Sequence, residues 1–365
     1  MDLAESAGKA ANMMSRWAIR LVVLTAVPVV NPAMPSLHGA ESRWKTYLAK
    51  PDEWYRGREG TRVVANVLSY QSDQGSWPKN LDTTAQLYTG DRRLLQGTFD
   101  NGATIGELRF LARSYRATQN EHYQDAFQKG LDHVLRARYP TGGWPQLYPP
   151  GKGYQRHITF NDGAMVNILE FLSDVTQSVD FSFVAEARRS AAEHGFDSGI
   201  QCILKCQIKV NGKLTIWCAQ HDETTLEPRW GRSFEPPALT SAESAGILRL
   251  LMSQDNPSPE IKRAVHAGAR WFERSRINGV RQTYRNGDKV IVQDKEAPPL
   301  WPRFSEIGTN RPVFCGRDGV IKYDIASIEA ERRNGYAWYG GWGSDVASRY
   351  SRWKERWDPE RIPGS

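Results

Sequence analysis

Two acidic steps, each followed by glycine and alanine, are the residues of this sequence that could do chemistry together. Asp100 stands in the string Asp-Asn-Gly-Ala, and Asp162 stands in the string Asn-Asp-Gly-Ala. Each string follows a Gly-x-Trp-Pro loop, around Trp77 in the first case and around Trp144 in the second. Copies of a repeat occupy equivalent points of successive structural units, so we expect both carboxylates at the same end of two helical hairpins. Such a pair could hold a cation or serve as a catalytic acid and base.

Helix capping is the competing interpretation of these strings. Asp and Asn cap helices well, because their side-chain oxygens accept hydrogen bonds from the free N–H groups of the first turn. A repeat copies a cap as readily as it copies a ligand, so duplication alone does not decide between the two roles.

The second half of the chain supplies cations in loops that are rich in glycine, proline and aromatic residues. Arg232 lies in Trp-Gly-Arg-Ser-Phe-Glu-Pro-Pro, and Arg303 lies in Leu-Trp-Pro-Arg-Phe. Arg311 and Arg317 follow in Thr-Asn-Arg-Pro and Gly-Arg-Asp-Gly. Arginine binds carboxylates through two parallel hydrogen bonds and stacks on rings, which lysine does less well. Any one of them could be a surface salt bridge, but four in such loops indicate an anionic ligand.

The composition agrees with an anionic partner. Lys and Arg number 48 against 41 Asp and Glu, which gives a formal net charge of +7. No dense basic run and no recognisable nucleic-acid-binding pattern is present in the sequence, so we expect no nucleic-acid partner. Tryptophans in loops, such as Trp144 and Trp301, could stack on sugar rings or could simply fill the interior. An acidic polysaccharide explains both the charge and the aromatic residues.

The first forty residues have the pattern of an export signal. Arg16 and Arg20 precede an apolar run over residues 21–30, which is too short to cross a bilayer as a permanent helix. We therefore expect a signal peptide over residues 1–40, a secreted or periplasmic protein, and no stable membrane insertion after cleavage.

Four cysteines occur in the second half of the chain, at Cys202, Cys206, Cys218 and Cys315. The spacing of the first three with His221 is irregular for structural zinc, so we set that interpretation aside. In an exported protein these cysteines could be buried free thiols or could form one disulfide.

Most of the mature chain has the apolar spacing of amphipathic helices. Helices are predicted over residues 55–70, 102–117, 123–135, 165–175, 183–205, 241–253, 259–275 and 325–335. The turn residues Asn211-Gly212 and Asn286-Gly287-Asp288 predict two β-hairpins, over residues 208–217 and 280–292.

The tryptophan loops set the predicted architecture. They recur at Trp77, Trp144 and, more loosely, Trp217, and each interval is long enough for two helices and two loops. We predict an all-α catalytic domain over residues 45–345, built of helical hairpins as an (α/α) toroid or barrel with short β-hairpins. A C-terminal tail is expected over residues 346–365, and the protein is expected to be a monomer.

Five ordered strings carry a family resemblance. They are Gly-Gly-Trp-Pro-Gln-Leu-Tyr-Pro at 142–149, His-Ile-Thr-Phe-Asn-Asp-Gly-Ala-Met at 157–165, Asn-Gly-Lys-Leu-Thr-Ile-Trp-Cys-Ala-Gln-His-Asp at 211–222, Arg-Asp-Gly-Val-Ile-Lys-Tyr at 317–323 and Arg-Arg-Asn-Gly-Tyr-Ala-Trp-Tyr at 332–339. These strings resemble those of pectate lyases of polysaccharide lyase family ten, and the likeness runs from about residue 60 to residue 343.

The resemblance implies calcium-dependent anti-β-elimination of polygalacturonate, which yields 4,5-unsaturated oligogalacturonates. It implies that Asp100 and Asp162 hold Ca²⁺ together with carboxylates of the substrate, and that Asn101 and Asn161 assist in binding. The donor types are consistent with this role, because Ca²⁺ requires hard oxygen ligands, which Asp and Asn provide.

The resemblance also assigns roles to the cations. Arg232 corresponds to the catalytic base, Arg303 and Arg317 correspond to ligands of the substrate carboxylates, and Arg311 could exchange that role with a neighbour. An arginine base is chemically demanding, because arginine is almost never neutral in proteins. Lys79, in Trp-Pro-Lys-Asn, is the easier base because the pKa of lysine falls readily on burial; otherwise it is a substrate ligand.

Three other functions compete with elimination. A glycoside hydrolase would use Asp100 and Asp162 as its two carboxylates, with Glu235 or Glu243 in reserve, but it leaves the arginine loops unexplained. A non-catalytic pectin-binding protein would not need the full set of candidate residues. A terpenoid cyclase would need an Asp-rich diphosphate motif, which the sequence lacks.

Overall fold

The structure is a computed structural model that describes residues 37–358 of the chain. The predicted signal peptide over residues 1–40 lies outside the described residues except for its last four positions, which begin helix α1 (Leu37–Leu48). Among the described residues, no helix is both long enough and apolar enough to cross a membrane.

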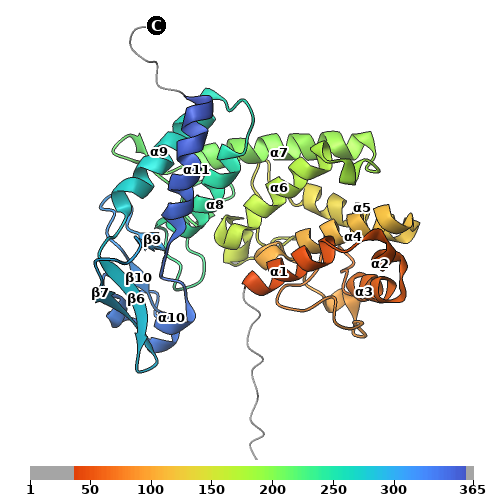
Figure 1. Cartoon of the computed structure of the whole chain (residues 1–365), viewed down its shortest axis with the longest axis horizontal. Helices are drawn as coiled ribbons and strands as arrows, with labels where there is room; N and C mark the ends of the chain where they lie inside the picture. Colours follow the sequence, from red (N-terminus) through yellow and green to blue (C-terminus); the bar gives the residue numbers. More distant parts are fainter. Residues whose placement is uncertain (1–36, 359–365) are drawn as a thin grey trace, which may run out of the picture. The chain divides into compact units, whose positions relative to one another are not determined.

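Helices make up most of the described chain (Figure 1). After α1 come α2 (Asp52–Arg56), α3 (Arg58–Ser69), α4 (Ile105–Thr118), α5 (Glu121–Arg136), α6 (Ala164–Gln177), α7 (Glu186–Cys206), α8 (Ser241–Met252), α9 (Pro259–Ser275), α10 (Ala330–Gly335) and α11 (Trp342–Trp357). Each of the eight predicted helical segments contains a helix, so the apolar spacing was a reliable guide. In the last of them α10 is preceded by a separate 3-10 turn, Ile325–Ser327.

Helix α11 was not predicted, and it corrects the expected C-terminal tail over residues 346–365. The helix packs against α8 and α9, as Figure 1 shows, and buries Val346 and Trp353. Lys262 of α9 donates a hydrogen bond to the carbonyl of Trp357. The boundary at residue 345, which was drawn where the family resemblance ends, therefore falls inside a packed helix.

Both predicted β-hairpins are present. Strands β2 (Lys209–Val210) and β3 (Lys213–Leu214) flank the Asn-Gly turn, and β6 (Val280–Arg285) pairs antiparallel with β7 (Asp288–Gln293). In each turn the asparagine and the glycine that follows it have positive φ angles, which the type I′ geometry of a two-residue hairpin requires.

Four further antiparallel pairs are formed by two-residue strands; the first three join segments that are distant in sequence, and the fourth is local. They are β1 (Ile158–Thr159) with β4 (Gln220–His221), β5 (Leu239–Thr240) with β9 (Phe304–Ser305), β8 (Trp301–Pro302) with β12 (Tyr339–Gly340), and β10 (Phe314–Cys315) with β11 (Ile321–Lys322). The sequence did not reveal these pairs, because two residues are too few to show alternation.

The repeat comprises four tryptophan loops rather than the three that the sequence suggested. In each loop the indole N–H donates a hydrogen bond of 2.7 or 2.8 Å to a carbonyl near the end of a preceding helix. The pairs are Trp77 with Val67, Trp144 with Val134, Trp217 with Ile203, and Trp301 with Phe272. Each tryptophan thus fixes the loop to the helix that ends beside it, and the two helices that follow the loop pack on each other, as α4 and α5 or α6 and α7 do in Figure 1.

These contacts correct one functional expectation. Trp144 is fully buried and Trp301 is 4% exposed, so neither can present a face to a sugar ring. The prediction that they bind substrate was wrong. Their indoles instead fill the interior, where the buried N–H finds the acceptor that it needs.

Candidate active site

The two acidic strings fold into 3-10 turns of the same shape. One turn, η2, spans Asp100–Gly102 before α4, and the other, η4, spans Asn161–Gly163 before α6. The middle residue is left-handed in both, with φ 54° at Asn101 and φ 51° at Asp162. The two turns contact each other. Asn and Asp tolerate this conformation better than other non-glycine residues, which explains their presence at the middle position.

The carboxylates do not cap the helices that follow. The N-terminal cap of α4 is Thr104 and that of α6 is Gly163, and neither helix receives a side-chain capping bond there. The capping interpretation was therefore wrong: the carboxylates of Asp100 and Asp162 contact other side chains instead.

Asp100 is buried, with one oxygen engaged and the other free. Its Oδ2 atom accepts hydrogen bonds from Lys79 Nζ and, at 2.9 Å, from Gln146 Nε2. Its Oδ1 atom is buried and has no hydrogen-bond partner among the described residues. Burial raises the pKa of Asp100 above its usual value, although the neighbouring Lys79 ammonium works in the opposite direction. A buried carboxylate oxygen without a partner is costly, so this atom has a strong need for a cation or a donor.

Asp162 lies at the centre of a second set of contacts. Its Oδ1 atom is 3.3 Å from the guanidinium of Arg303, and its Oδ2 atom accepts a hydrogen bond of 2.8 Å from the amide of Asn161. The carboxylates of Asp162 and Asp100 are close enough to repel each other, and this repulsion contributes to the raised pKa of Asp100.

Arg303 is brought to Asp162 by one of the short strand pairs. The pairing of β5 with β9 places Arg303 directly beside the start of α8, where the Arg303 carbonyl accepts a hydrogen bond from Ser241. The buried carboxylate of Glu243, in the first turn of α8, forms an ion pair with Arg303, and the guanidinium lies 4.8 Å from the ring centre of Tyr336. Burial lowers the pKa of Arg303, but the surrounding groups, Glu243 first among them, together outweigh this effect, so the pKa is raised overall and the guanidinium remains charged.

Arg232 is held beside the two turns by a carboxylate of its own loop. Glu235, which is 3% exposed, accepts hydrogen bonds from the backbone N–H and the guanidinium of Arg232, and it also accepts one of 3.0 Å from the hydroxyl of Tyr336. The Arg232 guanidinium interacts electrostatically with both Asp100 and Asp162. Burial lowers the pKa of Arg232. The hydrogen bond and the charge of Glu235 act in the opposite direction, and the pKa is raised overall.

The remaining two arginines lie in different surroundings. Arg317 is exposed and forms an ion pair of 2.9 Å with Glu331; its guanidinium is 5.9 Å from the ring of Phe234, on which Arg232 also lies, at 4.7 Å. Arg311 lies 3.9 Å from the ring centre of Tyr323. No contact among the described residues joins Arg311 to the carboxylates or to Arg232, so the structure does not place it in the site.

The structure therefore brings together Lys79, Asp100, Asp162, Arg232 and Arg303 from four separate loops. Two buried carboxylates that the sequence named only as reserves for hydrolysis, Glu235 and Glu243, hold Arg232 and Arg303 respectively. Three further residues that contact or interact with this site were not named from the sequence: Gln146, Tyr154 and Tyr336. Gln146 and Tyr336 lie within the strings that carry the family resemblance, which was the available signal.

A different group of residues could also hold a metal ion. Ligand atoms of His157, Asp222 and Glu223 lie within 4.8 Å of one another. However, Glu223 already pairs with Arg156 and Asp222 pairs with Arg229. These ion pairs join two loops and explain the group without a metal ion. By contrast, the buried Oδ1 atom of Asp100 has no partner among the described residues.

The cysteines play no part in this site. Cys202, Cys206, Cys218 and Cys315 are all buried and free. Of the two alternatives that the sequence left open, free thiols are therefore correct, and no disulfide forms among the described residues.

Comparison with known proteins identifies the family. Residues 71–347 match the family model described as pectic acid lyase. The fold is similar to a family 10 polysaccharide lyase from Cellvibrio cellulosa, with a TM-score of 0.75 and 35% identity over 87% of this chain and 96% of that one. A mutant of that enzyme in complex with trigalacturonic acid gives a TM-score of 0.74 and 34% identity over 88% of this chain and 98% of the other. No curated protein matches the chain.

The fold and the site define a polysaccharide lyase with a helical toroid fold. The chain belongs to the pectic acid lyase family, as the resemblance predicted. It is an enzyme, and its class is lyase, so the interpretations as a hydrolase, a sugar-binding protein and a cyclase are superseded.

Proposed function

We propose that this lyase cleaves α-1,4-linked polygalacturonate by calcium-dependent anti-β-elimination. The observation that carries the proposal is the meeting of two acidic turns with two arginines that come from distant loops. A similar lyase has been determined with trigalacturonic acid, which supports the same substrate class for this chain.

The donor set at the two turns suits calcium. Asp100 and Asp162 offer only carboxylate oxygens, with amide oxygens beside them at Asn101 and Asn161, and one oxygen of Asp100 has no other partner. Calcium prefers such hard oxygen ligands in flexible arrangements, and carboxylates of the substrate would complete its shell. When bound, the ion would withdraw charge from the uronate carboxylate beside the reacting carbon.

Elimination requires removal of a weakly acidic proton. The proton leaves C5 of a galacturonate residue, the C5–H electrons form the C4=C5 double bond, and the C4–O bond to the neighbouring sugar breaks. The departing oxygen takes a proton and becomes the new chain end, while the other fragment carries the 4,5-unsaturated sugar. Negative charge builds on the carboxylate at C5 during this step, so cations directed at that carboxylate lower the barrier.

The chain's own residues divide this work. Arg303 is fixed by Glu243 and Asp162 and would bind a substrate carboxylate as a permanent cation. We assign the base to Arg232, which lies beside both turns and is partly open to solvent, with 41% of its side chain exposed. Lys79 pairs with Asp100 and is the alternative base; otherwise it is a ligand for the substrate. Arg317, near Arg232 across the ring of Phe234, would bind a second carboxylate.

Ultraviolet absorbance tests the proposal directly. Purified protein is incubated with polygalacturonate, with added calcium or with a chelator, and absorbance from the unsaturated sugar end is followed. We expect absorbance to rise with calcium and to stop rising with the chelator. Shortening of the polymer without new absorbance would contradict elimination, and unchanged rates in the chelator would contradict the calcium requirement.

Export and a monomeric state belong to the same proposal. Secretion or periplasmic delivery would bring the enzyme to a polymer that is too large to enter a cell. N-terminal sequencing of protein recovered outside the cytoplasm would locate the cleavage point, and light scattering would give the mass in solution. An intact N-terminus in recovered protein would contradict cleavage.

A further inference from the structure

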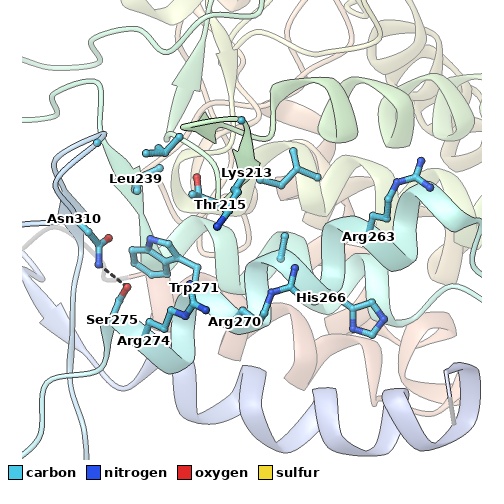
Figure 2. Close-up of a pocket in the computed structure, with 15 residues that line it drawn as sticks. Lys213, Thr215, Leu239, Arg263, His266, Arg270, Trp271, Arg274, Ser275 and Asn310 are labelled. Carbon is cyan, nitrogen blue, oxygen red and sulfur yellow. Dashed lines mark hydrogen bonds between the residues drawn. The ribbon is translucent and has the colours of Figure 1, made fainter. Parts of the chain in front are cut away.

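A basic groove lies along helix α9, apart from the acidic turns. Its walls come from α9, from the β2–β3 hairpin and from the turn around Asn310, and it encloses a volume of about 810 Å³ (Figure 2). None of the residues assigned above to calcium, to the base or to the substrate carboxylates lines it. It is therefore a separate feature that the proposed mechanism does not use.

The lining of the groove is strongly positive. Five of its side chains are basic, and none is acidic: Lys213, Arg263, His266, Arg270 and Arg274. Arg263 pairs with Glu260, and His266 pairs with Asp358. Lys213, Arg270 and Arg274 are exposed and form no ion pair with any other described residue. Three unneutralised cations facing one hollow produce a field that favours an anionic ligand.

The cations are arranged in a row. Arg270 and Arg274 lie four residues apart and therefore project from the same face of α9, about 6 Å apart along its axis. Figure 2 shows Lys213 on the hairpin above that face. A polymer with a carboxylate on every sugar would meet successive cations along this row.

The floor of the groove adds two polar atoms that lack partners. The indole N–H of Trp271, a residue that is only 7% exposed, has no acceptor among the described residues. The amide oxygen of Asn310 has no donor, although its Nδ2 atom donates a hydrogen bond of 2.7 Å to Ser275. In Figure 2 both side chains lie at the same end of the groove. A hydroxyl group can donate and accept at once, so it could satisfy a free acceptor and a free donor together.

We propose that this groove is a second binding site for polyuronate, which retains a remote segment of the polymer while another segment is cleaved. This inference rests on the proposed function, because it takes the same substrate class. Unpaired cations match the carboxylates of the polymer, and the unpartnered polar atoms of Trp271 and Asn310 match its hydroxyl groups. The benefit is multivalent: a chain held at two sites is lost more slowly than a chain held at one.

The test separates binding from catalysis. Polygalacturonate binding is measured by affinity electrophoresis for the double variant Arg270→Ala/Arg274→Ala, in an Asp100→Ala background that leaves the polymer intact. The matched control is Arg58→Ala/Arg62→Ala, which removes two exposed arginines, also four residues apart, from helix α3. We expect the groove variant to bind the polymer about tenfold more weakly, equivalent to about 1.4 kcal/mol. The control should bind the polymer within about a factor of two of the Asp100→Ala protein, because surface substitutions away from a binding site have only small effects.

Short substrates and a second polyanion complete the design. With Asp100 restored, the groove variant should cleave trigalacturonate at the wild-type rate, because a trimer held at the cleavage site has no remote segment to bind in the groove. The groove variant should also bind heparin more weakly, because the two arginines attract any polyanion. Asn310→Gly, which keeps the left-handed turn, should weaken the binding of polygalacturonate but not that of heparin.

Three outcomes would overturn the inference: equal polygalacturonate binding by the groove and control variants, equal loss of heparin and polygalacturonate binding in Asn310→Gly, or impaired trimer cleavage by the groove variant. Absence of lyase activity in the wild type would instead refute the proposed function, whatever the groove variant binds.

Discussion

The turns that carry Asp100 and Asp162 have the same backbone but place their carboxylates at different positions. In the first turn the carboxylate precedes the left-handed residue, is buried, and pairs with Lys79 from its own repeat. In the second turn the carboxylate belongs to the left-handed residue itself, remains partly open, and pairs with Arg303 from far along the chain. A duplicated loop has thus diverged into two unequal halves of one site.

The two carboxylates and the two arginines of the site also come from different parts of the sequence. The anionic half comes from the repeat and lies within residues that share a local pattern. The two arginines come from loops in the second half of the chain, and they are held in place by two buried carboxylates, Glu235 and Glu243. Each turn can therefore be tested by removing its own carboxylate, and each arginine by removing the group that holds it.

Loss of either turn carboxylate is expected to have the largest effect. Asp100→Ala should abolish turnover, a loss of about 10³-fold or more, because it removes the charge on which the proposed cation depends. Asp162→Asn, which tolerates the left-handed backbone, should have a similar effect. Turnover is measured by absorbance across a calcium titration, and circular dichroism checks the fold. Wild-type-like activity in either variant would show that the two turns are not equivalent in function.

Removal of Arg232 is the next test. Arg232→Ala should lower kcat by about 10²–10⁴-fold with little change in substrate binding, because a base acts in the transition state. Arg232→Lys should not restore the full rate, since lysine lacks the planar guanidinium. If Lys79→Ala is the inactive variant and Arg232→Ala loses only affinity, the two roles are reversed.

The pH profile distinguishes the same two bases in a different way. Glu235 raises the pKa of Arg232, so its neutral form is scarce and activity should increase toward alkaline pH. Glu235→Gln removes that stabilisation of the charged form, so the pKa of Arg232 should fall and the alkaline rise should move to lower pH. An unchanged profile in this variant would argue against Arg232 as the base.

The buried pair of Arg303 and Glu243 should matter for stability as well as for activity. Arg303→Met leaves Glu243 buried without its cation, which should destabilise the fold by about 3–5 kcal/mol. The double variant Arg303→Met/Glu243→Leu should recover much of that stability yet remain inactive. Denaturant unfolding gives the free energies. A single variant as stable as the wild type would show that Glu243 is protonated in the fold, in keeping with its raised pKa.

The exposed Arg317 should give the smallest effect. Arg317→Ala removes a surface cation whose exposed ion pair with Glu331 is screened by solvent, so stability should hardly change. If it binds a substrate carboxylate, KM should rise by a few-fold while kcat falls less. Arg311→Ala, which removes an arginine that stacks on Tyr323 away from the turns, is the control and should leave both constants unchanged.

The helices, the two longer hairpins and the doubled acidic string were predictable from the sequence, because each depends on local spacing. A 3–4 residue apolar period, an Asn-Gly turn and a repeated Gly-x-Trp-Pro loop are decided within one element and its flanks. Family membership was predictable for the same reason, since its strings are continuous. Helix α11 was missed, and the roles of Trp144 and Trp301 were predicted wrongly. Burial depends on what packs against a residue in the fold and not on the residues beside it in the sequence.

Sequence by itself thus determined which residue types were present and which of them recur. Tertiary structure decided which arginines reach the carboxylates. The pairing of β5 with β9 brings Arg303 to Asp162 across 141 positions, whereas Arg311, only eight residues beyond Arg303 in the sequence, stacks elsewhere. Two-residue strands fix these distances through backbone hydrogen bonds that nearly any side chain permits, so no sequence pattern records them.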